Sequence, residues 1–177
     1  MSQGLDTFHT VLRAREDRAR RQHELLNQFN LPLISATVVA PGPNKSTALY
    51  RDVLDVAQQT LREVFSSPPW KIVHEEAYHS PAGPEAFFVI SGSSASDIKN
   101  AVVQLEETHP IGRLWDLDVI LPDMTILSRQ QFGLPPRRCL VCNNEALGCA
   151  RSRAHTLSQL KDKIKSLFEL YRKERHM

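Results

Sequence analysis

The sequence predicts a single α+β domain in which a mixed β-sheet of about four to five strands carries helices on one face. Two observations support this class. Four long segments place apolar residues at helical spacing, and four short segments are β-branched or alternate apolar with polar residues. A chain of 177 residues is long enough to form one hydrophobic core without disulfides, so we expect residues 1–177 to form one domain.

Helices are expected over four segments, of which the second has the clearest pattern. Residues 6–29 have arginines crowded in their middle, which fits either a solvated helix face or a face turned toward an anion. Residues 44–65 carry an apolar stripe formed by Leu49, Val53, Ala57, Leu61, Val64 and Phe65. Residues 96–108 and 156–175 complete the set.

Strands are expected over residues 33–40, 70–79, 85–90 and 112–121. A Pro-Gly-Pro break follows the first strand and leads into a helix N-terminus, where unpaired backbone N–H groups can bind phosphate. Lys45 lies in this loop and is therefore a candidate phosphate ligand, although the glycine spacing of a Walker loop is missing.

Composition and charge narrow the function classes. A net charge of +2 is too small to indicate nucleic-acid binding by itself. Apolar runs fall far short of the about 20 residues of a membrane span, and the N-terminus lacks the pattern of a secretory signal. Three cysteines cannot form a disulfide framework and fit a reducing compartment. We expect a cytoplasmic protein that does not contact a membrane.

Two aspartates interrupt the last strand. Trp115, Leu117 and Val119 form one apolar face, so Asp116 and Asp118 both point to the other face. Carboxylates about 6–7 Å apart on a strand repel each other unless a cation lies between them. A Mg²⁺ ion that also binds substrate phosphates would explain the pair and predicts phosphoryl or nucleotidyl transfer. Ordinary ion pairs with arginines are the alternative. Candidates for a third metal ligand or a general base are Glu75, Glu76, Asp97 and Asp123.

Cysteines and a histidine gather in residues 139–155. Cys139 and Cys142 have the C-x₂-C spacing of a zinc knuckle, and Cys149 with His155 could complete a Cys₃His tetrahedron around a structural Zn²⁺. The alternative is that these are small buried apolar residues, which cysteines commonly are.

Four arginines bracket this cluster and make a dense positive patch. Guanidinium groups bind phosphate oxygens with two hydrogen bonds at once, so a polyphosphate could lie between the arginines and the aspartates. The alternative is a role in surface solubility. The arginines concerned are Arg137, Arg138, Arg151 and Arg153.

Three segments resemble the holo-acyl-carrier-protein synthase family of citrate lyase. They are His-Pro-Ile-Gly-Arg-Leu-Trp-Asp-Leu-Asp-Val (109–119), Leu-Ser-Arg-x-x-x-Gly-Leu-Pro-Pro-Arg-Arg-Cys-x-x-Cys (127–142) and Cys-Ala-Arg-Ser-Arg-x-His (149–155). The arginine-rich stretch 15–22 and the loop 41–45 are also similar to that family. The resemblance covers roughly residues 5–170.

This resemblance implies a definite activity. Such enzymes transfer phosphoribosyl-dephospho-CoA from 2′-(5″-triphosphoribosyl)-3′-dephospho-CoA to a serine of the acyl-carrier (γ) subunit of citrate lyase, and pyrophosphate leaves. Asp116 and Asp118 would then hold Mg²⁺ and carry the catalysis. Candidates for binding the substrate are Arg113, Lys45, Arg18, Arg137, Arg138, Arg151 and Arg153. Carrier proteins are typically acidic, so a basic face would steer their docking.

Two alternatives and one departure accompany this interpretation. The equivalent transferase of malonate decarboxylase would use the same donor with a different carrier. A non-enzymatic zinc-knuckle module that binds RNA through its arginines would leave the aspartates unexplained. A nucleotidyltransferase-like fold would place a Gly-Ser pair shortly before the Asp-x-Asp strand, but the candidate Gly92-Ser93 precedes Asp116 by a long stretch.

Overall fold

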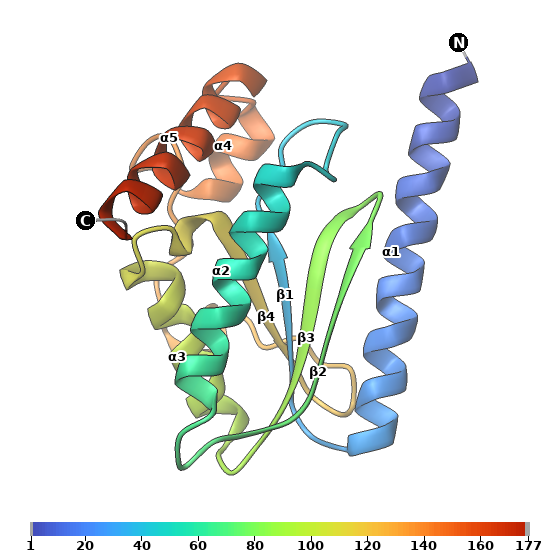
Figure 1. Ribbon diagram of the computed structural model, residues 1–177, viewed down its shortest axis with the longest axis vertical. Coiled ribbons are helices and arrows are strands. Elements are labelled where there is room, and N and C mark those ends of the chain that lie inside the picture. Colours follow the sequence, from blue (N-terminus) through green and yellow to red (C-terminus); the bar gives the residue numbers. More distant parts are fainter. Residues whose placement is uncertain (1, 176–177) are drawn as a thin grey trace.

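The computed structural model describes residues 2–175, and Figure 1 shows an open sheet with helices on either side. All eight expected helices and strands are present, and a short additional helix, α4, lies within the cysteine cluster. The elements are α1 (Ser2–Phe29), β1 (Leu33–Val38), α2 (Ala48–Phe65), β2 (Lys71–Ser80), β3 (Gly83–Ser91), α3 (Ala95–Thr108), β4 (Trp115–Ile120), α4 (Ala146–Ser152) and α5 (Leu157–Arg175), with 3₁₀ turns η1 (Gly112–Leu114) and η2 (Gln130–Phe132).

The sheet is antiparallel throughout, so the α+β class is confirmed and the expectation of a mixed sheet is wrong. Its strand order is β2-β3-β1-β4, and each pair of neighbours is antiparallel. The helical connections from β1 to β2 and from β3 to β4 each join strands that run in the same direction. In both cases a third strand lies between the two and pairs antiparallel with each of them. The two parallel strands are therefore never direct neighbours in the sheet.

The main core lies between the sheet and the helices α2 and α3. Alternate residues of β1, β3 and β4 point into it. Thr47 caps the start of α2 by accepting a hydrogen bond from the Tyr50 backbone N–H at 3.3 Å. Trp115 is fully buried there, and its Nε1 donates to the Val53 carbonyl at 3.1 Å. The start of β4 is therefore fixed to α2 by packing and by a hydrogen bond.

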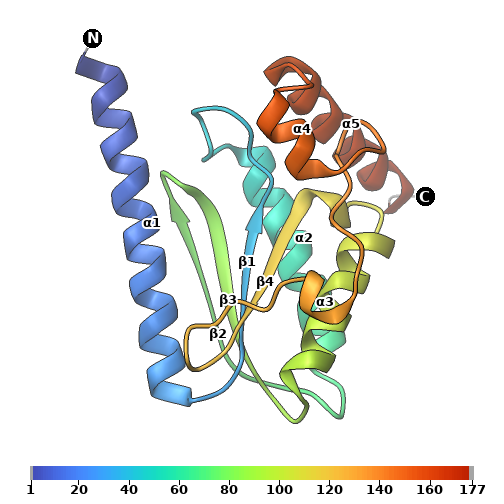
Figure 2. The same ribbon diagram turned by 180° about the vertical axis from the view of Figure 1, so that it is seen from behind.

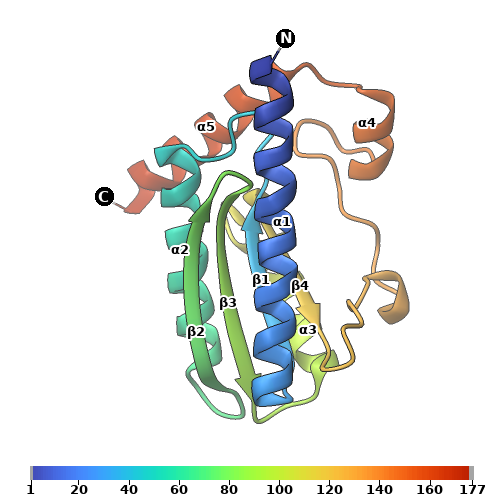
Figure 3. The same ribbon diagram turned by 90° about the vertical axis from the view of Figure 1, so that its right-hand side faces the viewer.

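Helix α1 covers the opposite face of the sheet, so the expectation that all helices lie on one face is also wrong (Figure 3). Leu25 and Leu26 of α1 pack on Leu33, Phe87 and Ile120, which lie on three neighbouring strands. Strand β3 explains why helices are needed on both faces of the sheet. Every residue from 84 to 90 is buried, and a strand that is buried on both faces must be covered on both sides.

The chain after β4 runs along the outer edge of the sheet before it reaches α4 and α5 (Figure 2). The Leu127 backbone N–H donates to the Val119 carbonyl at 2.9 Å, so this segment pairs with β4. Helix α5 then returns to the core through Ile164, Phe168 and Tyr171. Among the helices within residues 2–175, none is long and apolar enough to cross a membrane.

Candidate functional site

The two aspartates of β4 lie on the same side of the sheet as α1. The strand alternates, so Leu117 points into the main core while Asp116 and Asp118 point away from it. Asp116 lies opposite Thr37 of β1, and Asp118 lies opposite Ser35. The arrangement agrees with the alternation expected from the sequence and gives one face of β4 two adjacent carboxylates.

The two carboxylates have different surroundings. The Asp116 side chain is 54% exposed and accepts a hydrogen bond from Arg137 Nη1 at 2.8 Å. Burial raises the pKa of Asp118 above its usual value, and the neighbouring charge of Asp116 raises it further. Lys99 of α3 favours the ionised form of Asp118, but burial of Lys99 lowers the pKa of its own ammonium group. The pair therefore combines one solvent-facing carboxylate with one enclosed carboxylate.

Buried polar groups of the neighbouring segments brace β4 along its outer edge. Glu106 of α3 accepts a hydrogen bond from the Leu117 backbone N–H at 2.9 Å and another from Arg129 Nη2 at 2.6 Å. Arg137 donates to the Trp115 carbonyl. Glu106 is 4% exposed, so this network is protected from water. The outer edge of β4 is therefore hydrogen-bonded beside its carboxylates.

Glu85 of β3 is a third carboxylate on this face, and it was not among the candidates drawn from the sequence. It lies opposite Thr37, two strand spacings or about 10 Å from Asp116. Its side chain is fully buried and is paired with Arg18 and Arg21 of α1. Arg18 is thus committed to an internal ion pair. The available signal was an acidic residue at the start of the otherwise apolar segment 85–90.

The four acidic residues that the sequence left open as a third ligand or base each have other partners. Glu75 pairs with Arg62, Glu76 contacts His74, Asp97 accepts hydrogen bonds at the start of α3, and Asp123 accepts one from Thr125 in a turn.

The Gly-Ser pair also lies away from the aspartates. Gly92 follows the end of β3 that faces Leu33, whereas Asp116 faces the other end of β1. The glycine just before β4 is Gly112, where an added Cβ would lie 2.2 Å from the Leu105 carbonyl oxygen.

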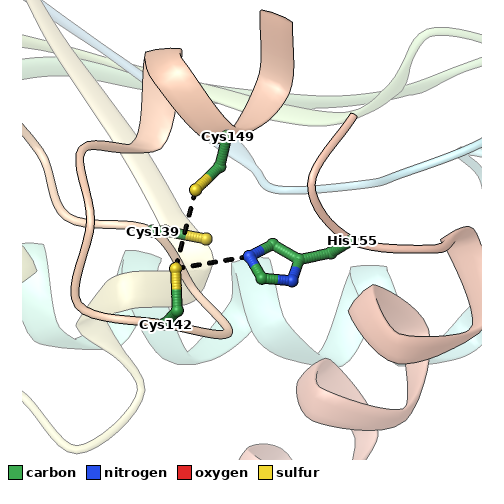
Figure 4. A group of neighbouring side chains, drawn as sticks. All are labelled: Cys139, Cys142, Cys149 and His155. Atoms are coloured by element: carbon green, nitrogen blue, oxygen red, sulfur yellow. Dashed lines mark hydrogen bonds between the residues drawn. The ribbon is translucent and has the colours of Figure 1, made fainter. Parts of the chain in front are cut away.

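Three cysteines and one histidine converge on a single point (Figure 4). The ligand atoms of Cys139, Cys142, Cys149 and His155 all lie within 4.8 Å of one another. Cys142 Sγ is 3.5 Å from Cys149 Sγ and 3.3 Å from His155 Nε2. Burial opposes ionisation of Cys139, but hydrogen bonds from the backbone of Cys142 and Val141 and from the other thiols lower its pKa to about 7.

Two of the candidate arginines connect this cluster to β4. Arg113 donates from Nη2 to the Cys139 carbonyl at 2.6 Å and also to the Arg138 carbonyl. Arg137 contacts Asp116, as described above. A cavity of about 270 Å³ opens beside them. It is lined by Glu107, Arg113, Arg129, Pro135, Pro136, Arg137 and Arg138.

A larger, mainly apolar cavity of about 810 Å³ is lined in part by Cys139, Cys149 and His155 of the cluster. Its walls come from the segment after β1, from α4 and from the start of α5, and Arg153 and His155 contribute its polar part. Arg151 is exposed on α4. The Val39 backbone N–H donates to the Leu114 carbonyl at 2.8 Å, so this wall of the cavity adjoins the start of β4.

Lys45 lies apart from these groups. Its Nζ donates to the Ala40 carbonyl at 2.6 Å, and it lines a separate cavity of about 490 Å³ beside Thr10 and Val11 of α1. Burial lowers the pKa of Lys45, and the charge of Arg15 lowers it further. Of the predicted site residues, Asp116, Arg113, Arg137 and Arg138 come together with the cysteine cluster, whereas Lys45 and Arg18 contact other partners.

Comparison with known proteins agrees with the resemblance found in the sequence. A family model described as apo-citrate lyase phosphoribosyl-dephospho-CoA transferase matches residues 6–171. Proteins of that name from Escherichia coli O1:K1 and from Shigella boydii serotype 18 are each 41% identical over 157 residues. The alignments cover 89% of this chain and 85% of each relative.

Proposed function

Because the chain belongs to the apo-citrate lyase phosphoribosyl-dephospho-CoA transferase family, we propose that it attaches this prosthetic group to a serine of the acyl-carrier subunit of citrate lyase. The donor would be 2′-(5″-triphosphoribosyl)-3′-dephospho-CoA. The serine oxygen forms a bond to the α-phosphorus, the bond from that phosphorus to the bridging oxygen breaks, and pyrophosphate leaves with that oxygen. The serine proton is released.

The carboxylate pair of β4 is the observation that carries this proposal. Asp116 and Asp118 offer hard oxygen ligands on one face of a braced strand, and the half-exposed Asp116 leaves room for a phosphate. This donor set fits Mg²⁺, which binds proteins through one or two carboxylates and takes its other ligands from phosphates and water. When bound, the ion would neutralise charge that develops on the phosphoryl oxygens.

The arginines beside the pair would bind the departing pyrophosphate. The cavity of about 270 Å³ is lined by four guanidinium groups and one carboxylate, so its charge suits an anion. Arg137 belongs to this cavity and also holds Asp116, so an anion bound there would lie next to the carboxylate pair.

The cavity of about 810 Å³ is suited to the long organic arm of the donor. Its volume falls within the range of ordinary small-molecule sites, about 300–1,000 Å³. Its walls are mainly apolar, and it adjoins the start of β4 through Val39 and Leu114. A donor with its phosphates at Asp116 could therefore extend its nucleotide and pantetheine groups into this cavity.

A mass-shift assay tests the proposal. We expect the apo acyl-carrier subunit of citrate lyase, incubated with this protein, the triphosphoribosyl donor and Mg²⁺, to gain the mass of phosphoribosyl-dephospho-CoA on one serine. The apo carrier of malonate decarboxylase serves as the comparison acceptor and should be modified far more slowly. An unchanged carrier mass in the presence of all three components would refute the proposed reaction.

A further inference from the structure

Cys139, Cys142, Cys149 and His155 take no part in the bond-making steps proposed above, although three of them line the large cavity. We propose that these four residues hold one structural Zn²⁺ ion, and that this ion fixes the arginine-bearing segment against β4. The proposal is independent of the transferase activity, because it depends only on the geometry and packing of residues 137–155.

The distances within the cluster match a tetrahedral zinc site. Zinc lies about 2.3 Å from thiolate sulfur and about 2.0–2.1 Å from imidazole nitrogen, which places neighbouring ligand atoms about 3.5–3.8 Å apart. The separations of 3.5 Å between the sulfurs of Cys142 and Cys149, and of 3.3 Å from Cys142 Sγ to His155 Nε2, are close to that spacing. Four protein ligands close the coordination sphere, as in structural rather than catalytic zinc sites.

The ligands reach this point from three parts of the chain (Figure 4). Cys139 and Cys142 come from a tight loop, Cys149 from α4, and His155 from the turn before α5. Backbone hydrogen bonds from Val141 and Cys142 reach the sulfur of Cys139. Such hydrogen bonds stabilise a thiolate and orient it toward a metal.

Packing gives a second and independent reason for an ion. Between residues 128 and 160, Cys139 and Cys149 are the only buried residues. Phe132 and Leu140 pack against the main core but are only partly buried. So little buried surface does not offset the conformational entropy of ordering the segment, about 1–2 kcal/mol per residue. A disulfide between Cys142 and Cys149 would leave a thiol and an imidazole unused. A metal uses all four.

The site would also position the arginines. Arg113 binds the carbonyls of Arg138 and Cys139, so the backbone of the first ligand is tied to the start of β4. Arg137 lies two residues before that ligand and contacts Asp116. Holding Cys139 in place therefore holds the Arg137 guanidinium beside the carboxylate.

Metal analysis of the purified full-length protein tests the site directly. We expect about one zinc per chain after dialysis against metal-free buffer, and Co²⁺ added to the chelated protein should give the thiolate charge-transfer and tetrahedral absorption bands. Cys142→Ser should lose at least tenfold in zinc affinity, whereas Ser152→Ala on α4, the helix that carries Cys149, should bind zinc as the wild type does. A metal-free wild type with three freely reactive thiols, or equal affinity in Cys142→Ser, would overturn the proposal.

Trypsin provides a readout of the positioning role that needs no substrate. It cleaves after arginine, and residues 137–153 contain four candidate sites at Arg137, Arg138, Arg151 and Arg153. Removing zinc, or substituting Cys142 by serine, should speed cleavage at these sites at least tenfold. Far-UV circular dichroism should report that the sheet and the long helices remain. Cleavage at the wild-type rate in the zinc-free protein would show that the ion does not order this segment.

Discussion

Strand β4 and the cysteine segment 137–155 lie side by side, yet they are held in place by different means. All six residues of β4 pair with residues of β1. The side chains of β4 that point into the main core are between 0% and 2% exposed. The cysteine segment has two buried residues and depends on side chains that meet at one point. Asp116 and Asp118 thus lie on a strand of the sheet, and Arg137 and Arg138 beside them lie on a segment with few buried residues. Damage to one region should therefore leave the other intact.

Loss of a carboxylate on β4 should have the largest effect on activity. Asp118→Asn or Asp116→Asn should reduce the rate of prosthetic-group transfer by about 10³-fold or more, because a metal ligand and its charge are lost. Carrier mass gain over time measures the rate, and the circular dichroism spectrum should not change. Asp162→Asn, an exposed aspartate of α5, is the matched control. Full activity in both β4 variants would show that these aspartates do not hold a catalytic metal ion.

The buried ion pair on the α1 face should give the largest effect on stability. Glu85→Gln leaves Arg18 and Arg21 without their carboxylate, and breaking such a buried pair costs about 3–5 kcal/mol. A chain of this size should then lose about 10 °C in Tm. Calorimetry with and without a zinc chelator tests whether the two regions are independent, because the chelator should not increase the loss of Tm caused by Glu85→Gln. Retention of the wild-type Tm would mean that α1 is held by its apolar contacts alone.

Arg137 joins the two regions, so its substitution should affect activity more than stability. Arg137→Lys cannot bind Asp116 and the Trp115 carbonyl with one planar fork, and we expect a decrease of about 10–100-fold in kcat/KM. Arg172→Lys on the exposed side of α5 should match the wild type. Equal kinetics for the two variants would show that the contacts of Arg137 do not contribute to the transfer reaction.

Filling the large cavity should change substrate binding without disturbing either region. Leu160→Trp places a bulky ring among the cavity walls and should raise KM for the donor about tenfold, with a smaller change in kcat. Leu170→Trp makes the same substitution at an exposed position of the same helix and should leave KM unchanged. A KM that is equal in both variants would place the organic arm of the donor elsewhere.

The smallest expected effect concerns the pH dependence of stability near β4. Burial lowers the pKa of His109, whose ring lies 4.4 Å from that of Trp115. A depressed histidine pKa contributes stability that is present above the unfolded value of about 6.5 and is lost as the pH falls below it. Between about pH 7.5 and pH 5.5, the wild type should lose more stability than His109→Gln in urea unfolding. His23→Gln, at an exposed site, should follow the wild type.

Local patterns in the sequence predicted those structural features that are set by residues close together in the chain. The alternation over Trp115–Val119 gave the face of the two aspartates, and the spacing of Cys139, Cys142, Cys149 and His155 gave a group that does meet in space. Both features lie within short stretches of chain, five residues for the alternation and seventeen for the cysteine cluster, where strand and loop geometry suffice.

Partnerships between distant segments were not predictable in this way. Glu85 and Arg18 are 67 residues apart, and nothing in either local pattern indicates the ion pair. The antiparallel sheet follows from where β3 and β1 insert, which is a matter of long-range pairing. Arg113, a candidate phosphate ligand, also donates to the Cys139 carbonyl, a contact that forms only because the fold brings the cysteine loop against it.

The outer edge of β4 has a consequence for how the protein associates with copies of itself. Unpaired N–H and C=O groups on an edge strand act as a template for another strand. Here Glu106, Arg137 and the backbone of Leu127 already use the groups of Leu117, Trp115 and Val119. A second chain cannot extend the sheet across β4, so the strand that bears the carboxylates is protected from edge-to-edge aggregation.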